Sequence, residues 1–157
     1  MALRGWLAAF ACVSELLFDL AIYGRWFTGG QNVFFTLLIG LLTCMALDEA
    51  ARRWPQLRMP VQIGILLAGY ALAEWGLRTD YGGFGVVFIC VLYLLRHARL
   101  WECIGGAVSI GFEITSVLAF IPIYFYNGTR GRQPKWFFYW FYPLHLALLY
   151  ALRLTLM

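Results

Sequence analysis

The stretch that decides the fold is residues 136–157, which read Trp136-Phe-Phe-Tyr-Trp-Phe-Tyr-Pro-Leu-His-Leu-Ala-Leu-Leu-Tyr-Ala-Leu-Arg-Leu-Thr-Leu-Met157. An apolar helix of about 20 residues is long enough to cross a bilayer. The seven consecutive aromatic residues at its start, 136–142, are typical of the aromatic belt at a membrane interface. The pattern predicts a transmembrane helix that enters the membrane through its aromatic end.

Five more apolar stretches precede this one, at residues 3–23, 32–50, 60–75, 81–95 and 104–126. The stretch 81–95 is short and begins with glycines, which leaves open a tilted span, a re-entrant segment or a helix buried by its neighbours. We therefore predict an all-α fold, a polytopic transmembrane helical bundle of about six spans. It forms a single integral membrane domain over residues 1–157.

The composition supports the membrane interpretation. Hydrophobic residues make up 62% of the chain and charged residues 13%, about half the charged share of an ordinary soluble domain. One soluble core cannot hide that much apolar surface. The net charge of +4 would suggest nucleic acid in a soluble protein, but here the basic residues bracket apolar runs. Membrane topology explains them, so we expect a lipid bilayer and no nucleic acid as the partner.

The four cysteines, Cys12, Cys44, Cys90 and Cys103, fall in or beside apolar stretches. They show neither Cys-x-x-Cys nor Cys/His spacing, so we expect no metal site. Small buried hydrophobic side chains are the expected role.

The basic residues also predict an orientation. With six spans both termini lie on one side of the membrane, and the basic residues of that side are Arg4, Arg52, Arg53, Arg58, Arg96, Arg99 and Arg153. The opposite side has Arg25, Arg78, Arg130, Arg132 and Lys135. The positive-inside rule then favours cytoplasmic termini. A cleaved signal peptide at the start is a weaker alternative, because the apolar core of such a peptide does not normally carry two carboxylates.

Those two carboxylates, Glu15 and Asp19, are the first candidate site residues. Each ionisable group in the hydrocarbon layer costs on the order of 2.5 to 3.5 kcal/mol and therefore needs a partner, a water-filled cavity or a function. At i,i+4 spacing they share a helix face and cannot both ionise cheaply if dry. One of them can serve as an acid or base, or Asp19 can meet water or Arg25 at the membrane surface, and both interpretations stay open.

Other polar residues recur at helical spacing. Asn32, Thr36, Gly40 and Thr43 form one stripe, which predicts a helix-packing surface with Asn32 as N-cap. Ser109, Glu113 and Ser116 line up in the fifth stretch, so Glu113 is expected to face the bundle interior.

His145 follows closely after Pro143, which cannot donate a hydrogen bond to the carbonyl of Tyr139. An opened backbone beside an imidazole invites a polar ligand, and a neutral imidazole can act as general base near pH 7. A histidine that merely hydrogen-bonds a neighbouring helix is the alternative.

The loop before this helix, residues 126–135, contains three cations and two glycines. Glycines let backbone amides approach an anion and arginines offer paired donors, which suits either the phosphates of a nucleotide-like cofactor or lipid headgroups.

Residues 126–146, Tyr-Asn-Gly-Thr-Arg-Gly-Arg-Gln-Pro-Lys-Trp-Phe-Phe-Tyr-Trp-Phe-Tyr-Pro-Leu-His-Leu, resemble the C-terminal signature of the TraX family, membrane proteins of bacterial conjugation systems and their chromosomal relatives. Three further segments agree with it in order: Ser14-Glu-Leu-Leu-Phe-Asp-Leu20, Gln31-Asn-Val-Phe-Phe-Thr-Leu-Leu38 and Asp80-Tyr-Gly-Gly-Phe-Gly-Val86. Family members usually begin with further membrane segments that contain an Asp-His pair, so the resemblance leads us to expect spans before Met1.

The resemblance implies a multi-pass protein of the bacterial inner membrane linked to N-terminal acetylation of pilin or a similar protein, with acetyl-CoA as donor. Its matching positions are Glu15, Asp19, Gln31, Asn32, Asp80, Tyr81, Asn127, Arg130, Tyr142, Pro143 and His145. In the resulting hypothesis His145 deprotonates the attacking amine and Glu15 or Asp19 orients a partner. The donor phosphates are held by Asn127, Arg130, Arg132 and Lys135. The alternative is a transporter or a conjugation or assembly subunit without catalytic activity.

Overall fold

The computed structural model describes residues 2–25, 29–111, 114–129, 131 and 134–156. These residues fold into helices, and outside the helices one isolated β-bridge pairs Gln31 with Thr79. The α-helices are α1 (Ala2–Tyr23), α2 (Val33–Arg53), α3 (Arg58–Ala71), α4 (Gly82–Leu95), α5 (Arg99–Ser109), α6 (Ile114–Val117), α7 (Phe120–Phe125) and α8 (Lys135–Leu156). A 3₁₀ turn at Pro55–Leu57 precedes α3, and a π turn at Leu72–Gly76 extends it.

The all-helical prediction is confirmed, whereas the six spans are not. Two of the described helices are long and apolar enough to cross a membrane, over Gly5–Tyr23 and Val33–Arg53. Each is close to the length that the hydrocarbon layer requires, and the one over Gly5–Tyr23 carries Glu15 and Asp19.

The fifth expected span, residues 104–126, is wrong as a single helix. In its place α5 and α7 form a hairpin, in which Gly106 packs against the ring of Phe120 and Arg99 donates to the carbonyl of Tyr124 at 3.5 Å. Because the start of α5 pairs with the end of α7 and the end of α5 with the start of α7, the chain turns back. The α5 helix has 11 residues and is about 16 Å long, half the thickness of a bilayer core. The apolar composition of the stretch conceals this break.

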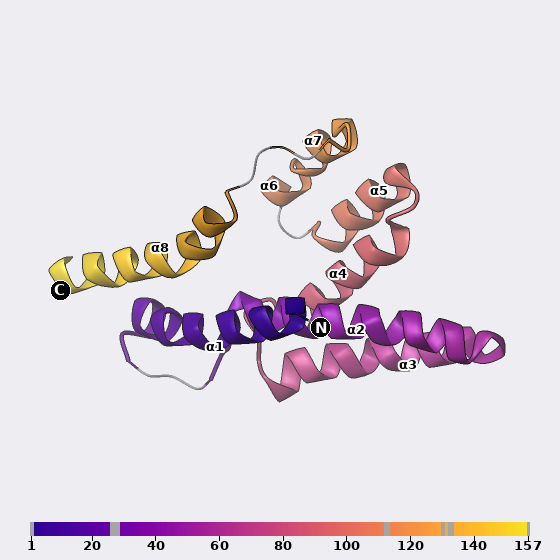
Figure 1. Cartoon of the computed structure of the whole chain (residues 1–157), viewed down its shortest axis with the longest axis horizontal. Coiled ribbons are helices and arrows are strands. Elements are labelled where there is room, and N and C mark those ends of the chain that lie inside the picture. The colour runs from indigo at the N-terminus through magenta and orange to yellow at the C-terminus, as the bar shows by residue number, and fades with distance from the viewer. Residues whose placement is uncertain (1, 26–28, 112–113, 130, 132–133, 157) are drawn as a thin grey trace.

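Helices α1 and α8 lie side by side and run in the same direction (Figure 1). Arg153 near the end of α8 donates to the carbonyls of Ala21 and Ile22 near the end of α1. Tyr142, eleven residues earlier, packs on Phe34, which in turn contacts Phe10. The start of α1 and the end of α8 therefore lie at opposite ends of the pair, whereas an even number of spans would have placed both at one end.

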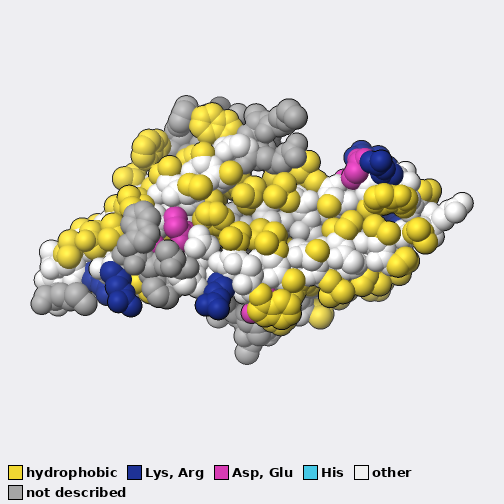
Figure 2. Space-filling model, turned by 90° about the horizontal axis from the view of Figure 1, so that it is seen from below, with side chains coloured by type: hydrophobic (Ala, Val, Ile, Leu, Met, Phe, Trp, Pro, Cys, Tyr) yellow, Lys and Arg dark blue, Asp and Glu magenta, His cyan; other side chains and the backbone are white. Residues whose placement is uncertain are grey.

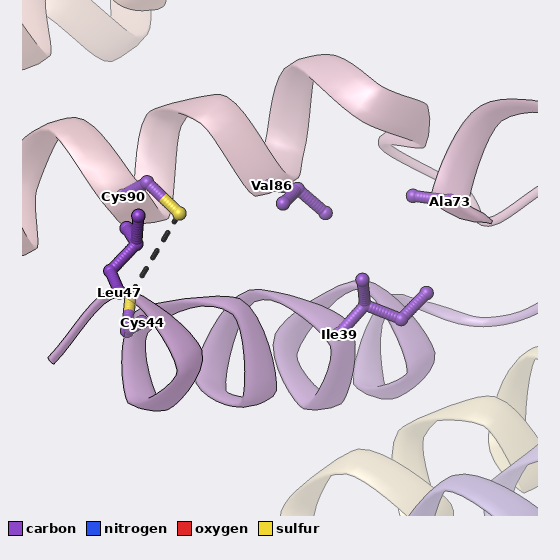
Figure 3. Packing of buried hydrophobic residues seen from close by; sticks show 6 residues of the cluster. All are labelled: Ile39, Cys44, Leu47, Ala73, Val86 and Cys90. Atoms are coloured by element: carbon purple, nitrogen blue, oxygen red, sulfur yellow. Dashed lines mark hydrogen bonds between the residues drawn. The ribbon is translucent and has the colours of Figure 1, made fainter. Parts of the chain in front are cut away.

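The core lies between α2 and α4, where six buried residues meet: Ile39, Cys44, Leu47, Ala73, Val86 and Cys90 (Figure 3). The sulfur atoms of Cys44 and Cys90 are 3.8 Å apart. Cys44, Cys90 and Cys103 are buried, as the sequence predicted, whereas the prediction is wrong for Cys12, which is exposed.

The small-residue stripe of α2 is a packing surface, as predicted. Gly40 lies against Ile89 of α4, and Thr43 lies against Gly69 of α3. Only a residue without a side chain lets the neighbouring helix approach this closely. Thr43 turns its hydroxyl onto the carbonyl of Ile39, which satisfies it within the helix.

Candidate functional site

The chain segments that precede α2 and α4 meet inside the bundle. The Gln31 N–H donates to the Arg78 carbonyl at 3.0 Å, and the Asp80 N–H donates to the Gln31 carbonyl at 2.8 Å. Backbone that leaves helical geometry within a membrane protein has to be paired inside the protein. This bridge brings two of the sequence segments with a family resemblance, 31–38 and 80–86, together at one level of the fold.

Glu15 and Asn32 form the centre of the polar cluster. The Glu15 Oε2 atom accepts from the main-chain N–H of Asn32 at 2.9 Å and from its side-chain Nδ2 at 2.7 Å. Nδ2 also donates to the Ala11 carbonyl, and Oδ1 accepts from the N–H of Phe34. Asn32 is thus the N-cap that the sequence predicted, and in addition it links α1 to α2.

Further polar groups surround this pair in the interior. Asp19 and Ser14 are 1% and 0% exposed, and a buried Asp19 disfavours the interpretation in which it meets water at the membrane surface. Among the described residues, Glu15 Oε1 and Thr36 Oγ1 are buried and have no hydrogen-bond partner. Unused acceptors and hydroxyls of this kind are costly in an apolar interior, and they are a usual sign of a site that receives a ligand.

Tyr142 and His145 approach the cluster from α8. The Tyr142 ring contacts Phe34 edge-on with the ring centroids 4.8 Å apart, and it lies within electrostatic range of the Asp80 and Glu15 carboxyl groups. His145 meets Tyr142 edge-on at 5.1 Å. No hydrogen bond joins His145 to Glu15 in the part of the chain that the structure describes.

The imidazole of His145 has a defined environment of its own. Its Nδ1 lies 3.1 Å from the Phe141 carbonyl, and the ring stacks on Phe141. Because a carbonyl only accepts hydrogen bonds, this contact requires a proton on Nδ1, and in the neutral ring Nε2 then keeps its lone pair. His145 also borders the exposed apolar face of α8 that Phe141, Leu144 and Leu148 form.

His145 and Glu15 lie at the same level of the bundle. Arg153 is hydrogen-bonded beside Ile22, and the parallel helices α8 and α1 have equal rise per residue. Eight residues back from Arg153 is His145, and eight residues back from Ile22 is Ser14, the neighbour of Glu15, about 12 Å in each case. The sequence predicted both residues as site residues without predicting that register.

Asp80 and Glu74 complete the polar groups near the start of α4. Surrounding protein atoms partly desolvate the carboxyl of Asp80 and raise its pKa above the ordinary value, although the residue as a whole remains exposed. Glu74 accepts from the Gly83 N–H at 2.9 Å and so caps α4. The sequence did not indicate Glu74 as a cap of α4, because Glu74 lies nine positions before Gly83, on the other side of the tight turn at Gly82 (φ +54°).

An apolar cavity of about 250 Å³ adjoins the cluster, between α2, α4 and the tip of the α5–α7 hairpin. Thr36, one helical turn beyond Asn32, and Tyr81, next to Asp80, both line it. The other polar side chains of its wall are Ser109 and Ser116, and the rest are apolar or glycine. A cavity of this composition suits a small apolar group that carries one or two hydrogen-bonding atoms.

The expected cofactor loop is described only in part. Asn127 holds its own turn, since its Oδ1 accepts from the N–H and the hydroxyl of Thr129. Arg130 and Arg132 lie outside the described residues, as does Glu113 of the fifth stretch. Lys135 is the first residue of α8. No contact among the described residues joins Asn127 to Glu15 or His145.

No solved structure matches the chain. Among characterised sequences, it is similar to the "Probable fimbrial assembly protein FimC, serogroup H1" of Dichelobacter nodosus, with 28% identity over 84% of this chain and 60% of that protein. The chain thus spans less than two thirds of the length of that relative. The family model of the TraX protein matches residues 2–153, nearly the whole sequence. On that match, and on the four sequence segments that converge on one polar cluster, the chain belongs to the TraX family.

Proposed function

We propose that this chain forms an acyl-transfer centre within a multi-pass protein of the bacterial inner membrane, and that it acetylates the N-terminal amine of pilin or a similar protein. The observation that carries the proposal is the common level of His145 and Glu15, with Tyr142 of α8 near the partly buried Glu15–Asn32 pair. Family membership and the fimbrial assembly relative support the link to pili.

In the proposed reaction acetyl-CoA is the donor substrate. The lone pair of the acceptor amine attacks the thioester carbonyl carbon, the carbon–sulfur bond breaks, and an amide and the CoA thiolate form. His145 Nε2 takes the proton that the amine nitrogen loses and passes it to the departing sulfur, so that charge and atoms balance. Glu15 and Asn32 hold the start of α2 against α1 at this level.

The donor phosphates are assigned to the loop before α8 on chemical grounds. Its three cations and two glycines provide charge-assisted donors with little steric hindrance. The small cavity beside Thr36 would accept the acetyl group or a longer acyl chain. Glu15 and Asp19 would keep the buried centre polar enough to admit an amine.

The direct test uses purified protein in detergent or nanodiscs with radiolabelled acetyl-CoA and peptides with a free N-terminus. Transfer of label that is lost in His145→Gln and kept in His97→Gln supports the proposal. His97 is the chain's other histidine and lies exposed in the turn after α4. Failure of the wild-type protein to label any peptide amine, with pilin included, would overturn it.

A second candidate is a pilus assembly subunit without catalysis, which the relative's description as a fimbrial assembly protein favours. The two candidates differ in what His145→Gln does in cells. An assembly subunit keeps pilus formation in that variant and leaves the pilin N-terminus unchanged from the wild type, which mass spectrometry of the pilin measures.

A further inference from the structure

We propose that the end of the bundle at which α2 and α4 terminate faces the cytoplasm and contacts anionic lipid headgroups, while the end of α8 reaches the opposite side of the membrane. This orientation does not depend on acyl transfer, and a non-catalytic subunit would have it as well. It places the loop before α8 on the cytoplasmic side and the end of α8 on the opposite side, the reverse of the orientation expected from six spans.

The first argument is that two connections lie at this end. Asp48 near the end of α2 accepts a hydrogen bond from the hydroxyl of Tyr93 near the end of α4. Arg96 lies over the Tyr93 ring, and Arg99 reaches the Tyr124 carbonyl at the end of α7. The α2–α3 and α4–α5 connections therefore leave the same end of the molecule, and α7 ends beside the start of α5. The end of α7 lies there because of the α5–α7 hairpin, whereas a single span over 104–126 would have carried it away from the start of α5.

The second argument is the distribution of charge. The arginines of these two connections are Arg52, Arg53, Arg58, Arg96 and Arg99, and all five are exposed. At the opposite end Arg25 follows α1 and Arg153 donates to the carbonyls of α1, while Arg78 lies in the connection before α4. The positive-inside rule favours the end with the five exposed arginines as the cytoplasmic one.

The third argument is length. From Tyr23 back to Glu15 is about 12 Å along α1, and from Asn32 to Leu47 is about 22 Å along α2. Since Glu15 and Asn32 are hydrogen-bonded, the apolar span between the two ends is about 34 Å, close to one hydrocarbon layer of about 30 Å. Asp48, Glu49 and the arginines then lie at headgroup level, where Lys and Arg side chains attract anionic lipids.

The surface agrees with this arrangement. Apolar side chains cover most of the face along the long axis, and the Lys, Arg, Asp and Glu side chains lie in a few separate groups on it (Figure 2). Exposed Trp54 and Trp101 belong to the same arginine-rich end, as expected of residues at the membrane interface.

Two consequences follow from the orientation. The loop over residues 126–134 starts on the cytoplasmic side, where a soluble nucleotide-like donor is available. The level of Glu15 and His145 lies about 12 Å from the other face, nearer to that face than to the cytoplasmic one. A donor and an acceptor could thus approach from opposite sides.

The test is cysteine accessibility in cells, in a background with the four native cysteines replaced by alanine. A membrane-impermeant maleimide should label Thr155→Cys in spheroplasts, and it should label Gln56→Cys and Thr129→Cys only after permeabilisation. Labelling of Gln56→Cys in intact spheroplasts would mean the reverse orientation. Labelling of Thr129→Cys with protection of Gln56→Cys would mean that residues 99–125 cross the membrane. Protection of Thr155→Cys would place both termini on one side. Each of these three results overturns the proposal.

A second measurement guards against misfolding of the cysteine-free chain. In the unaltered chain, a C-terminal alkaline phosphatase fusion should be active and a C-terminal GFP fusion dark. The paired change Arg52→Glu and Arg53→Glu should reduce phosphatase activity, because it removes positive charge that keeps this end of the bundle on the cytoplasmic side. Arg25→Glu at the other end should not reduce it. Equal reductions in both variants would contradict the role of the arginine-rich end.

Discussion

Asn32 donates both its main-chain N–H and its side-chain amide to one carboxylate oxygen of Glu15, at 2.9 and 2.7 Å. Replacing the carboxylate in Glu15→Ala leaves two buried donors without an acceptor. Such a loss costs about 1 to 3 kcal/mol in the free energy of unfolding. Glu15→Gln keeps a carbonyl oxygen as acceptor, so its free energy of unfolding should fall by less.

Denaturant unfolding of the purified protein in detergent measures both variants. The matched control is Glu49→Ala, which removes an exposed ion pair with Arg52 and should change the free energy of unfolding by less than about 1 kcal/mol. If Glu15→Ala is no less stable than Glu49→Ala, the pairing of Glu15 with Asn32 is not a structural link.

The local signals in the sequence were sufficient for much of the fold. The apolar run 3–23 became α1 within a residue at each end, and Asn32 caps α2 because an asparagine before an apolar run is a local signal. The break inside 104–126 was not predictable, because the stretch stays apolar throughout and the turn depends on how Phe120 packs on Gly106. Apolar periodicity reports which residues avoid water and not where the chain reverses.

The candidate site was predicted in the same uneven way. Glu15 and His145 stand out because an ionisable residue in an apolar run is costly. Their common level could not be derived, since it depends on the parallel packing of α1 with α8, 130 positions apart in the chain. The role of Asn32 as a partner of Glu15 is likewise a tertiary contact. The residues that cost most in the membrane were visible, and their partners were not.

His145 should act as general base if the proposed chemistry is correct. Removing a general base lowers the turnover rate by about 10²- to 10⁴-fold. His145→Gln should therefore lose transfer at saturating donor, with the Michaelis constant for acetyl-CoA unchanged. Steady-state kinetics of His97→Gln, which alters the exposed histidine, should match the wild type. A His145→Gln variant with the wild-type turnover rate would rule out the role.

The α5–α7 hairpin should be sensitive to the size of residue 106. A methyl group at Gly106 would meet the Phe120 ring at 2.4 Å, so Gly106→Leu must displace α7 from α5. Overpacking of this kind costs about 1 to 3 kcal/mol. Gly64 has no atom within 4 Å of an added methyl group, which makes Gly64→Leu the matched control. Proteolysis in the turn before α6 measures the opening, and equal cleavage in the two variants would speak against the hairpin.

The native cysteines should differ in reactivity. Cys12 is exposed, whereas Cys44 and Cys90 are 4% and 1% exposed in the core between α2 and α4. A small maleimide should modify Cys12 in folded protein in detergent and should reach Cys44 and Cys90 only after unfolding. Mass spectrometry of the labelled peptides counts the modified positions. Rapid labelling of Cys90 in folded protein would mean that α2 and α4 separate readily.

Arg153 should fix the position of α8 on α1. It donates to the carbonyls of Ala21 and Ile22 in the last turn of α1, where a cation also interacts favourably with the helix dipole. Because Arg153 is only partly buried, we expect Arg153→Gln to lower the free energy of unfolding by about 1 kcal/mol, the size of a typical net hydrogen bond. Arg153→Lys keeps the charge but can donate to only one of the two carbonyls at a time. Its free energy of unfolding should therefore lie between those of the wild type and Arg153→Gln. Arg25→Gln alters an exposed cation just beyond the same helix end and should have a smaller effect.

Hydrogen exchange at the amides of residues 19–23 gives a more specific readout than stability. Exchange there should be faster in Arg153→Gln only if α8 holds the end of α1. The register that brings His145 level with Glu15 depends on this contact, so an Arg153→Gln variant with wild-type exchange and stability would remove the basis for placing the two residues together.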